Sequence, residues 1–567
     1  MGKNRTIVDR RLRSLFIIIF ICLISVSVRL VQIQAITATE YRKEAERQRM
    51  SSIELPPKRG AILDRNGDKL AVSVMMDTIY VTPYLIDDKE AFARKIAPIL
   101  KQDERELTNK LIKQTGFAYL VRKTDSKTVQ AVKDVVKKED IKGVGFIKES
   151  DRYFPNNTLG AQVVGFTGMD NHGLGGIENY YDDVLYGTPG RIIAERDAKG
   201  HPIPQTIESS TRPKDGWNIR ISIDTQIQYR AETELNATIQ KYKAKSGNVM
   251  VMNPETGEIY AMAGTPSFNP NDLKTIKNGN ARNISVTDLY EPGSTLKTMI
   301  ACGALQESVC RPSTSFYLEP TIRVGSKRIK DSHPRPAVTY TLSQIIQQSS
   351  NVGMVKVGML MGKEKIIKYL EKFAFGKKSG IDFPGEARGF YPSEDNWSKM
   401  SLANIPFGQG ISTTQLRMAT AYAAIANDGI PVRPHFLLDE TNSRGRVIAS
   451  ARIVKEEPVL DPETCRQMKR ILEGAVVKGT GGEAKIANYR VGGKTGTAQK
   501  AKVGGRGYDK GKYVASFIGM VPIEDPKLVI AVVIDEPQAN IYGGSVAAPV
   551  FSKVGEFALR YLKIPPD

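Results

Sequence analysis

The chain has 567 residues, a formal net charge of +20, 41% hydrophobic residues and 25% charged ones. This length predicts two to four domains, and the hydrophobic content excludes an extensively disordered protein. The positive charge suits an anionic partner. Because the basic residues are dispersed and no helix-turn-helix, zinc-finger or RNA-binding signature accompanies them, nucleic-acid binding is disfavoured.

Cysteine and histidine are scarce. Cys22 lies in the apolar N-terminal stretch, and the other three cysteines, Cys302, Cys310 and Cys465, are an odd number that implies no disulfide framework. The local context of Cys302 and Cys310 is apolar and favours buried thiols over a bridge. The four histidines are not spaced as metal ligands, so no metal site is expected. Their scarcity also disfavours a Ser-His-Asp triad.

The N-terminus carries a membrane signal. Basic residues between Lys3 and Arg13 precede the uncharged apolar run 15–28, and the apolar character resumes after Arg29. Since Arg29 lies late enough to snorkel to the far interface, residues 15–36 are predicted to form one transmembrane helix. A cleaved signal peptide is the alternative, although no convincing cleavage site follows. The basic tail, residues 1–14, is expected in the cytoplasm and the rest of the chain outside.

The next part of the chain predicts small and irregular elements. Residues 38–50 are charged and helix-prone and are interpreted as a stalk. The segment 58–67 contains Asn-Gly, a strong hairpin signal. Residues 89–113 and 127–138 have the spacing of amphipathic helices. The glycine-rich segment 173–178 superficially suggests a phosphate-binding loop, but its glycine spacing does not fit one.

A polar stretch with Pro213 and Gly216 predicts a boundary between a domain at 37–215 and a second domain at 216–567. The second domain has apolar hairpins near both ends and long helices between them, which predicts an α+β fold with helices packed on an antiparallel sheet. The predicted strands are 218–224, 248–252, 258–263, 513–521 and 528–534, and the longer predicted helices are 341–360, 412–427 and 547–562.

The segment Ser294-Thr295-Leu296-Lys297 is predicted to open a helix, because Pro292 and Gly293 before it do not extend one. The positive end of the helix dipole favours a developing alkoxide on Ser294, and Lys297 follows one turn later on the same face. An amine with an ordinary pKa of about 10.4 is a poor base. Lys297 therefore needs burial or a nearby cation, such as Lys494, to lower its pKa. Taken alone, the segment is more often a helix N-cap at Ser294 and a surface charge at Lys297.

The segment Ser349-Ser350-Asn351 is expected on a loop after the helix 341–348. There Ser349 can relay a proton to a leaving amine. The amide of Asn351 both donates and accepts hydrogen bonds, so it can hold a substrate peptide bond in line. Taken alone, this tripeptide is more often a turn or a helix cap.

The segment Lys494-Thr495-Gly496-Thr497 follows two glycines and is expected at a strand edge beside the cleft. Its lysine cation and the hydroxyls of Thr495 and Thr497 suit a substrate carboxylate. Gly496 leaves room for close approach of the substrate.

In this order the three segments resemble the S-x-x-K, S-D-N and K-T-G set of penicillin-binding proteins, with Ser-Ser-Asn as the middle motif. The segments 58–67 and 173–190 resemble the pedestal signatures of the class B branch. Residues 290–294 together with Asn351 resemble the division-type FtsI/SpoVD enzymes within it. Residues 407–416 also match a class B segment, so the resemblance covers nearly the whole chain.

The resemblance implies a pedestal at 37–215 and a penicilloyl-serine transferase domain at 216–567. It implies a serine D,D-transpeptidase that cross-links peptidoglycan stem peptides through an acyl-enzyme on Ser294, in septal cell-wall synthesis. The backbone N–H groups of Ser294 and Thr497 would form the oxyanion hole. No metal or organic cofactor is implied. The implied partners are β-lactams as covalent inhibitors, a SEDS-type glycosyltransferase, other division proteins and the plasma membrane.

Two alternatives stay open. A D,D-carboxypeptidase or β-lactam sensor on the same fold differs only in using water as the acyl acceptor or in retaining the acyl group. A non-catalytic scaffold of the division machinery would keep the anchor and pedestal without chemistry at Ser294.

Overall fold

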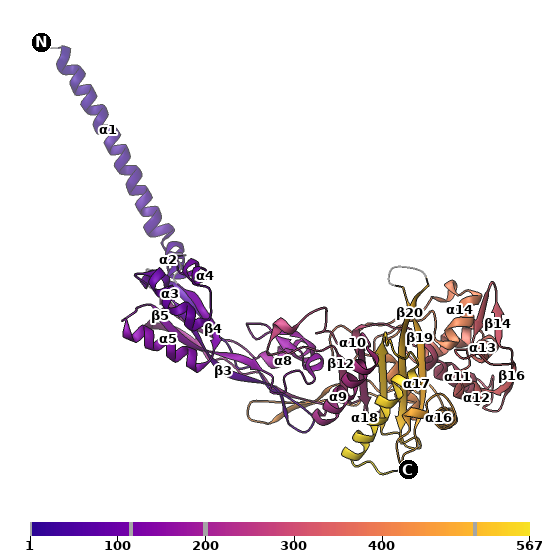
Figure 1. Ribbon diagram of the computed structural model, residues 1–567. Helices are drawn as coiled ribbons and strands as arrows, with labels where there is room; N and C mark the ends of the chain where they lie inside the picture. Colours follow the sequence, from indigo (N-terminus) through magenta and orange to yellow (C-terminus); the bar gives the residue numbers. More distant parts are fainter. Residues whose placement is uncertain (1–2, 113–116, 197–201, 503–506, 567) are drawn as a thin grey trace. The chain divides into compact units, whose positions relative to one another are not determined.

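The computed structural model describes residues 3–112, 117–196, 202–502 and 507–566 (Figure 1). The chain forms two compact units, each built from separate stretches of sequence. The first unit comprises residues 1–57, 75–149 and 188–214, and the second comprises 58–74, 150–187 and 215–567. Parts of the expected pedestal thus belong to the second unit, and the division at residue 215 stays a prediction.

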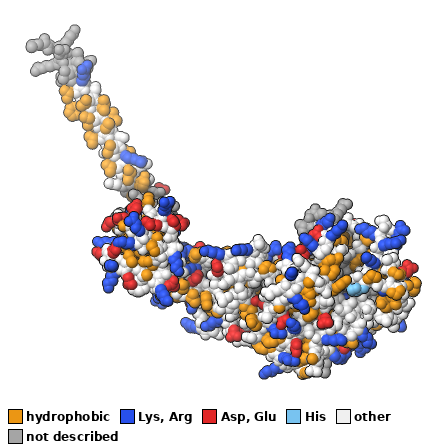
Figure 2. Space-filling model, viewed as in Figure 1, with side chains coloured by type: hydrophobic (Ala, Val, Ile, Leu, Met, Phe, Trp, Pro, Cys, Tyr) orange, Lys and Arg blue, Asp and Glu red, His pale blue; other side chains and the backbone are white. Residues whose placement is uncertain are grey.

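The first unit begins with α1 (Lys3–Val31), which continues in a π-helical turn (Gln32–Ile36). Its apolar side chains from Leu15 onward are exposed, as Figure 2 shows. Residues 11–35 are long and apolar enough to cross a membrane. A helix of this kind fits an anchor and a signal sequence equally well. The predicted apolar helix is confirmed, whereas its orientation stays a prediction.

The rest of the first unit is small and mixed. One three-stranded antiparallel sheet contains β1 (Met50–Leu55), β8 (Gly190–Arg196) and β9 (Pro202–Thr211). The helices are α2 (Ala38–Arg49), α3 (Lys89–Leu100), α4 (Glu104–Ile112) and α5 (Ser126–Lys138). The carboxylates of Asp88 and Asp125 cap α3 and α5. Apolar faces of α3, α4 and α5 join one core with β4 (Ala118–Thr124), which confirms the predicted amphipathic helices.

A five-stranded antiparallel sheet forms the centre of the second unit. Its order is β12 (Ile259–Thr265), β11 (Ser246–Met252), β21 (Leu528–Asp535), β20 (Tyr508–Val521) and β19 (Gly492–Ala501). Alternate residues enter two different cores: Val249 and Val251 pack with α9 (Thr225–Tyr242) and α18 (Ala548–Tyr561), and Met250 and Met252 with the large helical core. The predicted α+β fold is confirmed.

The helices near the catalytic motifs differ in two places from the prediction. Ser294 lies in a 3₁₀ turn (Gly293–Leu296), and α11 (Lys297–Gln306) follows it. The predicted helical stretch 341–360 is divided, because α12 (Leu342–Gln347) ends before Ser349 and α13 (Asn351–Lys372) begins after it; the turn expected at Ser349 is confirmed, whereas Asn351 already belongs to α13. The chain turns where Ser349 has a φ of +59°, a left-handed conformation that interrupts a helix.

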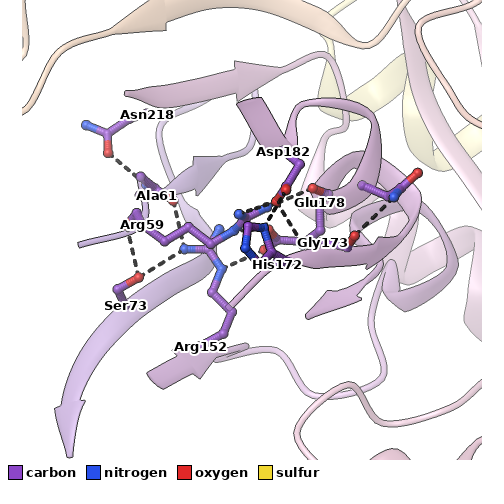
Figure 3. Close-up of polar contacts among 11 residues, drawn as sticks. Arg59, Ala61, Ser73, Arg152, His172, Gly173, Glu178, Asp182 and Asn218 are labelled. Carbon is purple, nitrogen blue, oxygen red and sulfur yellow. Dashed lines mark hydrogen bonds and ion pairs between the residues drawn. The ribbon is translucent and has the colours of Figure 1, made fainter. Parts of the chain in front are cut away.

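A buried ion cluster joins three distant segments of the second unit (Figure 3). The guanidiniums of Arg59 and Arg152 each donate through Nε to the Glu178 carboxylate, each at 2.6 Å. Arg59 also donates to Asp182, at 2.6 Å. Glu178 is fully buried, so these contacts replace the water that its charge would otherwise need.

The glycine-rich segment beside this cluster is used for packing. The N–H of Gly173 donates to Asp182 Oδ1 at 2.8 Å. A Cβ on Gly173 would lie 1.9 Å from the carbonyl oxygen of Glu178, so a larger residue would separate the two segments. These contacts occupy the backbone that a phosphate-binding loop would offer to a ligand.

Candidate active site

The loop that carries Ser294 is held from two sides. The N–H of Gly293 donates to the carbonyl of Gly408 at 3.1 Å. Gly408 has a φ of +87°, and a Cβ there would lie 1.9 Å from the carbonyl oxygen of Gly293, so this approach requires glycine. Tyr422 donates its hydroxyl to the carbonyl of Thr295 at 2.9 Å. The backbone of the predicted nucleophile is thereby tied to the 407–410 loop and to α15 (Gln415–Ala426).

Lys297 is completely buried at the start of α11. Its Nζ donates to the Ser349 carbonyl at 2.6 Å, to Ser349 Oγ at 3.3 Å and to Asn351 Oδ1 at 2.8 Å. Burial and the nearby Lys494 hold the pKa of Lys297 well below its usual value, while Asp331 opposes that shift. A lowered pKa supplies the neutral amine that a general base needs.

Lys494 is the second completely buried amine of the site. Its Nζ donates to Ser349 Oγ at 2.8 Å, so this hydroxyl lies between two lysines. Burial lowers the pKa of Lys494 to about 7. The amine is therefore divided between its charged and neutral forms near neutral pH.

The K-T-G segment forms the start of β19, the edge strand of the central sheet, as the sequence predicts. Thr495 Oγ1 lies 2.7 Å from Thr480 Oγ1, and Thr497 Oγ1 accepts the N–H of Gly543 at 3.1 Å. A Cβ on Gly496 would lie 2.2 Å from Ser516 Oγ. Gly496 thus allows close contact with the neighbouring strand.

A polar cleft of about 560 Å³ joins the three motifs. Ser294, Ser349, Thr495 and Thr497 all line it. Lys297 and Lys494 contact this lining because both donate to Ser349, and Asn351 accepts a hydrogen bond from Lys297. Seven of the eight predicted residues therefore lie at or directly behind one cleft, and Gly496 lies between Thr495 and Thr497, which line it. The cleft is large enough for a peptide end.

Several cleft residues escaped the sequence analysis, among them Asp331, His333 and Tyr542. Asp331 accepts hydrogen bonds from the turn that carries Ser349 and Asn351. The rings of His333 and Tyr542, whose centroids lie 4.9 Å apart, line the same cleft. These residues belong to loops without a recognisable spacing. For Asp331 and His333 the only local signal was a polar segment, 331–335, between two short strands.

Two family models match the chain in succession. The model described as "Penicillin-binding Protein dimerisation domain" matches residues 54–221, and the one described as "Penicillin binding protein transpeptidase domain" matches residues 247–556. Stage V sporulation protein D of Bacillus subtilis is 33% identical over 98% of this chain and 86% of its own length. Peptidoglycan D,D-transpeptidase FtsI of Escherichia coli is 33% identical over 95% of this chain and 90% of its own length.

Solved structures have the same fold. A peptidoglycan synthetase from Bifidobacterium adolescentis has a TM-score of 0.74 and 26% identity, covering 92% of this chain and 98% of that one. Penicillin binding protein 3 of Mycobacterium tuberculosis, solved with ampicillin, has a TM-score of 0.71 and 25% identity, covering 91% and 97%. From these matches and the three ordered motifs at one cleft, the protein belongs to the class B penicillin-binding proteins.

Proposed function

We propose that this protein cross-links peptidoglycan stem peptides through an acyl-enzyme on Ser294. As a class B penicillin-binding protein with a transpeptidase domain, it is a serine D,D-transpeptidase. One observation carries the assignment of the site. The buried amine of Lys297 has a lowered pKa and contacts Ser349 and Asn351 behind the cleft that Ser294 lines.

In the acylation step Lys297, as a neutral amine, takes the proton of Ser294 Oγ while this oxygen attacks the carbonyl carbon between the two terminal D-alanines. The backbone N–H groups of Ser294 and Thr497 stabilise the resulting oxyanion. Ser349, between the two lysine amines, gives its hydroxyl proton to the departing nitrogen and takes the proton from Lys297, so that this amine is neutral again. The terminal D-alanine leaves, and the ester on Ser294 remains.

In the second step the amine of a neighbouring stem attacks the ester carbonyl. It loses a proton to Lys297, and Ser294 Oγ leaves and is protonated again. Asn351 holds the peptide bond in line, and Lys494, Thr495 and Thr497 bind the terminal carboxylate of the donor stem. Gly496 lets β19 lie close to Ser516 and to the loop that carries Ser294, since a Cβ there would lie 2.2 Å from Ser516 Oγ and 3.2 Å from the carbonyl oxygen of Pro292.

We place the site of action at the plasma membrane. The basic residues before the apolar helix favour a cytoplasmic N-terminus and an external catalytic domain. Two of the relatives are named FtsI and stage V sporulation protein D, which supports a role in septal wall synthesis. A SEDS-type glycosyltransferase and other division proteins are the partners proposed for α1 and the unit that contains it.

Labelled penicillin tests the nucleophile. The full chain in detergent is incubated with the label and its intact mass is measured for wild type, Ser294→Ala and Ser332→Ala. Ser332 is a second serine of the same cleft and serves as the matched control. We expect one stable adduct on wild type and on Ser332→Ala and none on Ser294→Ala.

The acyl acceptor is tested separately, with a pentapeptide stem as donor and a second stem amine as acceptor. Cross-linked product supports the transpeptidase, whereas hydrolysed donor alone supports the carboxypeptidase. If a folded wild-type protein forms no adduct and no product, the non-catalytic scaffold becomes the better explanation.

A further inference from the structure

Asp331 lies in the loop between β15 (Lys327–Lys330) and β16 (Val338–Thr341). Its Oδ1 accepts the backbone N–H of Asn351 at 2.5 Å and that of Val352 at 3.0 Å. Both of its carboxylate oxygens lie 3.0–3.1 Å from Ser350 Oγ, which donates to them. The side chain is only 9% exposed. This one carboxylate therefore binds three successive residues of the catalytic turn.

These contacts do more than cap a helix. The cap of α13 is already supplied by Ser350, whose Oγ accepts the N–H of Gly353 at 3.0 Å. Asp331 comes from 20 residues before Asn351 and binds the N–H groups of the first two residues of α13, where negative charge is favoured. Asp331 thus joins the 331–335 loop to the turn that carries Ser349 and Asn351.

The same loop sets the orientation of the Asn351 amide. Asn351 Nδ2 donates to the carbonyl of Lys330 at 3.0 Å. Its Oδ1 is therefore directed at Lys297 Nζ, at 2.8 Å. If the loop moved, the amide would lose its anchor, and the base would lose one of its three acceptors.

The charge of Asp331 also acts on the base. Lys297 faces the cation of Lys494 from β19 and the anion of Asp331 from the β15–β16 loop, and these two charges affect its pKa in opposite directions. On its far side Asp331 pairs with Arg335, whose Nε donates to Oδ2 at 2.7 Å. The carboxylate is thus held in place between a guanidinium and the catalytic turn.

We propose that Asp331 is a positioning residue of the catalytic centre, which holds the Ser349–Asn351 turn against Lys297 and supplies a negative charge near this buried amine. The inference rests on the proposed function, because it assumes that Lys297 is the base for Ser294. A purely structural aspartate would affect folding and leave the chemistry of each folded molecule unchanged.

The test measures the rate of acylation by fluorescent penicillin between pH 5 and 10 on the full chain, for three variants of Asp331. Asp331→Asn keeps an acceptor oxygen and removes the charge. Asp331→Glu keeps the charge and displaces it by one methylene group. Asp331→Ala removes both. The matched control is Asp382→Asn, because Asp382 likewise accepts two backbone N–H groups and one hydroxyl, from Phe436, Leu437 and Tyr181.

For Asp331→Asn we expect the acid limb of the pH profile to move to lower pH by about one unit, since loss of the anion lowers the pKa of Lys297 further. Its plateau rate should fall about tenfold, because Arg335 loses its ion-pair partner. Asp331→Glu should be slower with an unmoved acid limb. In Asp331→Ala the rate of acylation should fall by at least about 100-fold. Asp382→Asn should melt at a lower temperature and keep the wild-type profile.

The proposal is overturned if Asp331→Asn slows acylation without moving the acid limb, or if, like the control, it changes neither the rate nor the profile. Melting curves identify any variant that does not fold. If Asp331→Ala does not fold, the more conservative Asn and Glu variants decide whether the proposal holds. Failure of this inference is distinguishable from failure of the proposed function. In the first case wild type still forms its adduct on Ser294, and in the second it does not.

Discussion

The second unit contains two buried clusters of basic side chains, and the clusters differ in the charge of the group that the basic side chains share. In the catalytic centre two amines, Lys297 and Lys494, share the hydroxyl of Ser349. In the ion cluster of Figure 3 two guanidiniums, from Arg59 and Arg152, share the carboxylate of Glu178. Both pairs of cations are buried, so exposure to water does not distinguish them.

The consequence of burial therefore depends on the partner. A hydroxyl does not compensate a buried positive charge, so both lysine pKa values fall and the amines become reactive. Glu178 compensates the guanidiniums directly, and an arginine does not release its proton in any case. The first arrangement costs stability and provides a base, whereas the second joins three segments of the fold.

The largest effect is expected from removing the base. Lys297→Met keeps the length and burial of the side chain, and we expect penicillin acylation of Ser294 to slow by at least about 10³-fold, because general base catalysis is lost. Lys500→Met is the control, since Lys500 lies on β19, the strand that carries Lys494, and pairs with Asp535. Less than a tenfold loss in Lys297→Met, in stopped-flow acylation, would contradict the role of Lys297.

Breaking the ion cluster should affect stability instead. Glu178→Gln leaves two buried guanidiniums without their shared anion, and we expect a loss of about 3–5 kcal/mol in the free energy of unfolding. Urea titration measures it, and Asp183→Asn, an exposed neighbour, should change stability by less than about 0.5 kcal/mol. Acylation per folded molecule should stay the same. A stable Glu178→Gln protein would refute the structural role of the cluster.

The charge on Lys494 predicts a dependence of stability on pH. Its pKa is about 7 in the folded protein and about 10.4 in an unfolded chain. Between these values the unfolded chain binds more protons, so this residue makes stability rise as the pH increases from 7 to 10.4.

Lys494→Met removes this proton linkage. The variant should be more stable than wild type by roughly 1–4 kcal/mol at pH 7, and the difference should shrink toward pH 10. It should also lose activity. Urea midpoints at several pH values test this, and a variant that is less stable at pH 7 would show that the hydrogen bonds of Lys494 outweigh its desolvation.

The smallest effect on stability is expected for a solvent-exposed ion pair. Arg490 pairs with Glu473 and Glu524 and is 46% exposed. We expect Arg490→Gln to change the free energy of unfolding by less than about 1 kcal/mol, because solvent screens such pairs. If the same urea titration gave a loss of stability as large as that of Glu178→Gln, the number of ion-pair partners rather than their burial would determine how much such a pair stabilises the fold.

The sequence by itself determined the elements whose signals are local. Asn66-Gly67 predicted the β2–β3 hairpin, between β2 (Ile62–Leu63) and β3 (Lys69–Val81), and Gly67 has a φ of +93°. Apolar alternation predicted the strands of the central sheet. The three ordered motifs predicted the catalytic chemistry, because each pairs residue types that act together over a few positions.

Only the tertiary structure decided how these elements are used. Ser349 interrupts a stretch with helical periodicity because its turn is held by Lys297 and by Asp331, which are distant in sequence. Arg59, Arg152 and Glu178 come from three segments that no spacing connects. The pKa values of the lysines follow from burial and from neighbouring charges. Such properties arise from contacts between segments, and local periodicity carries no information about those contacts.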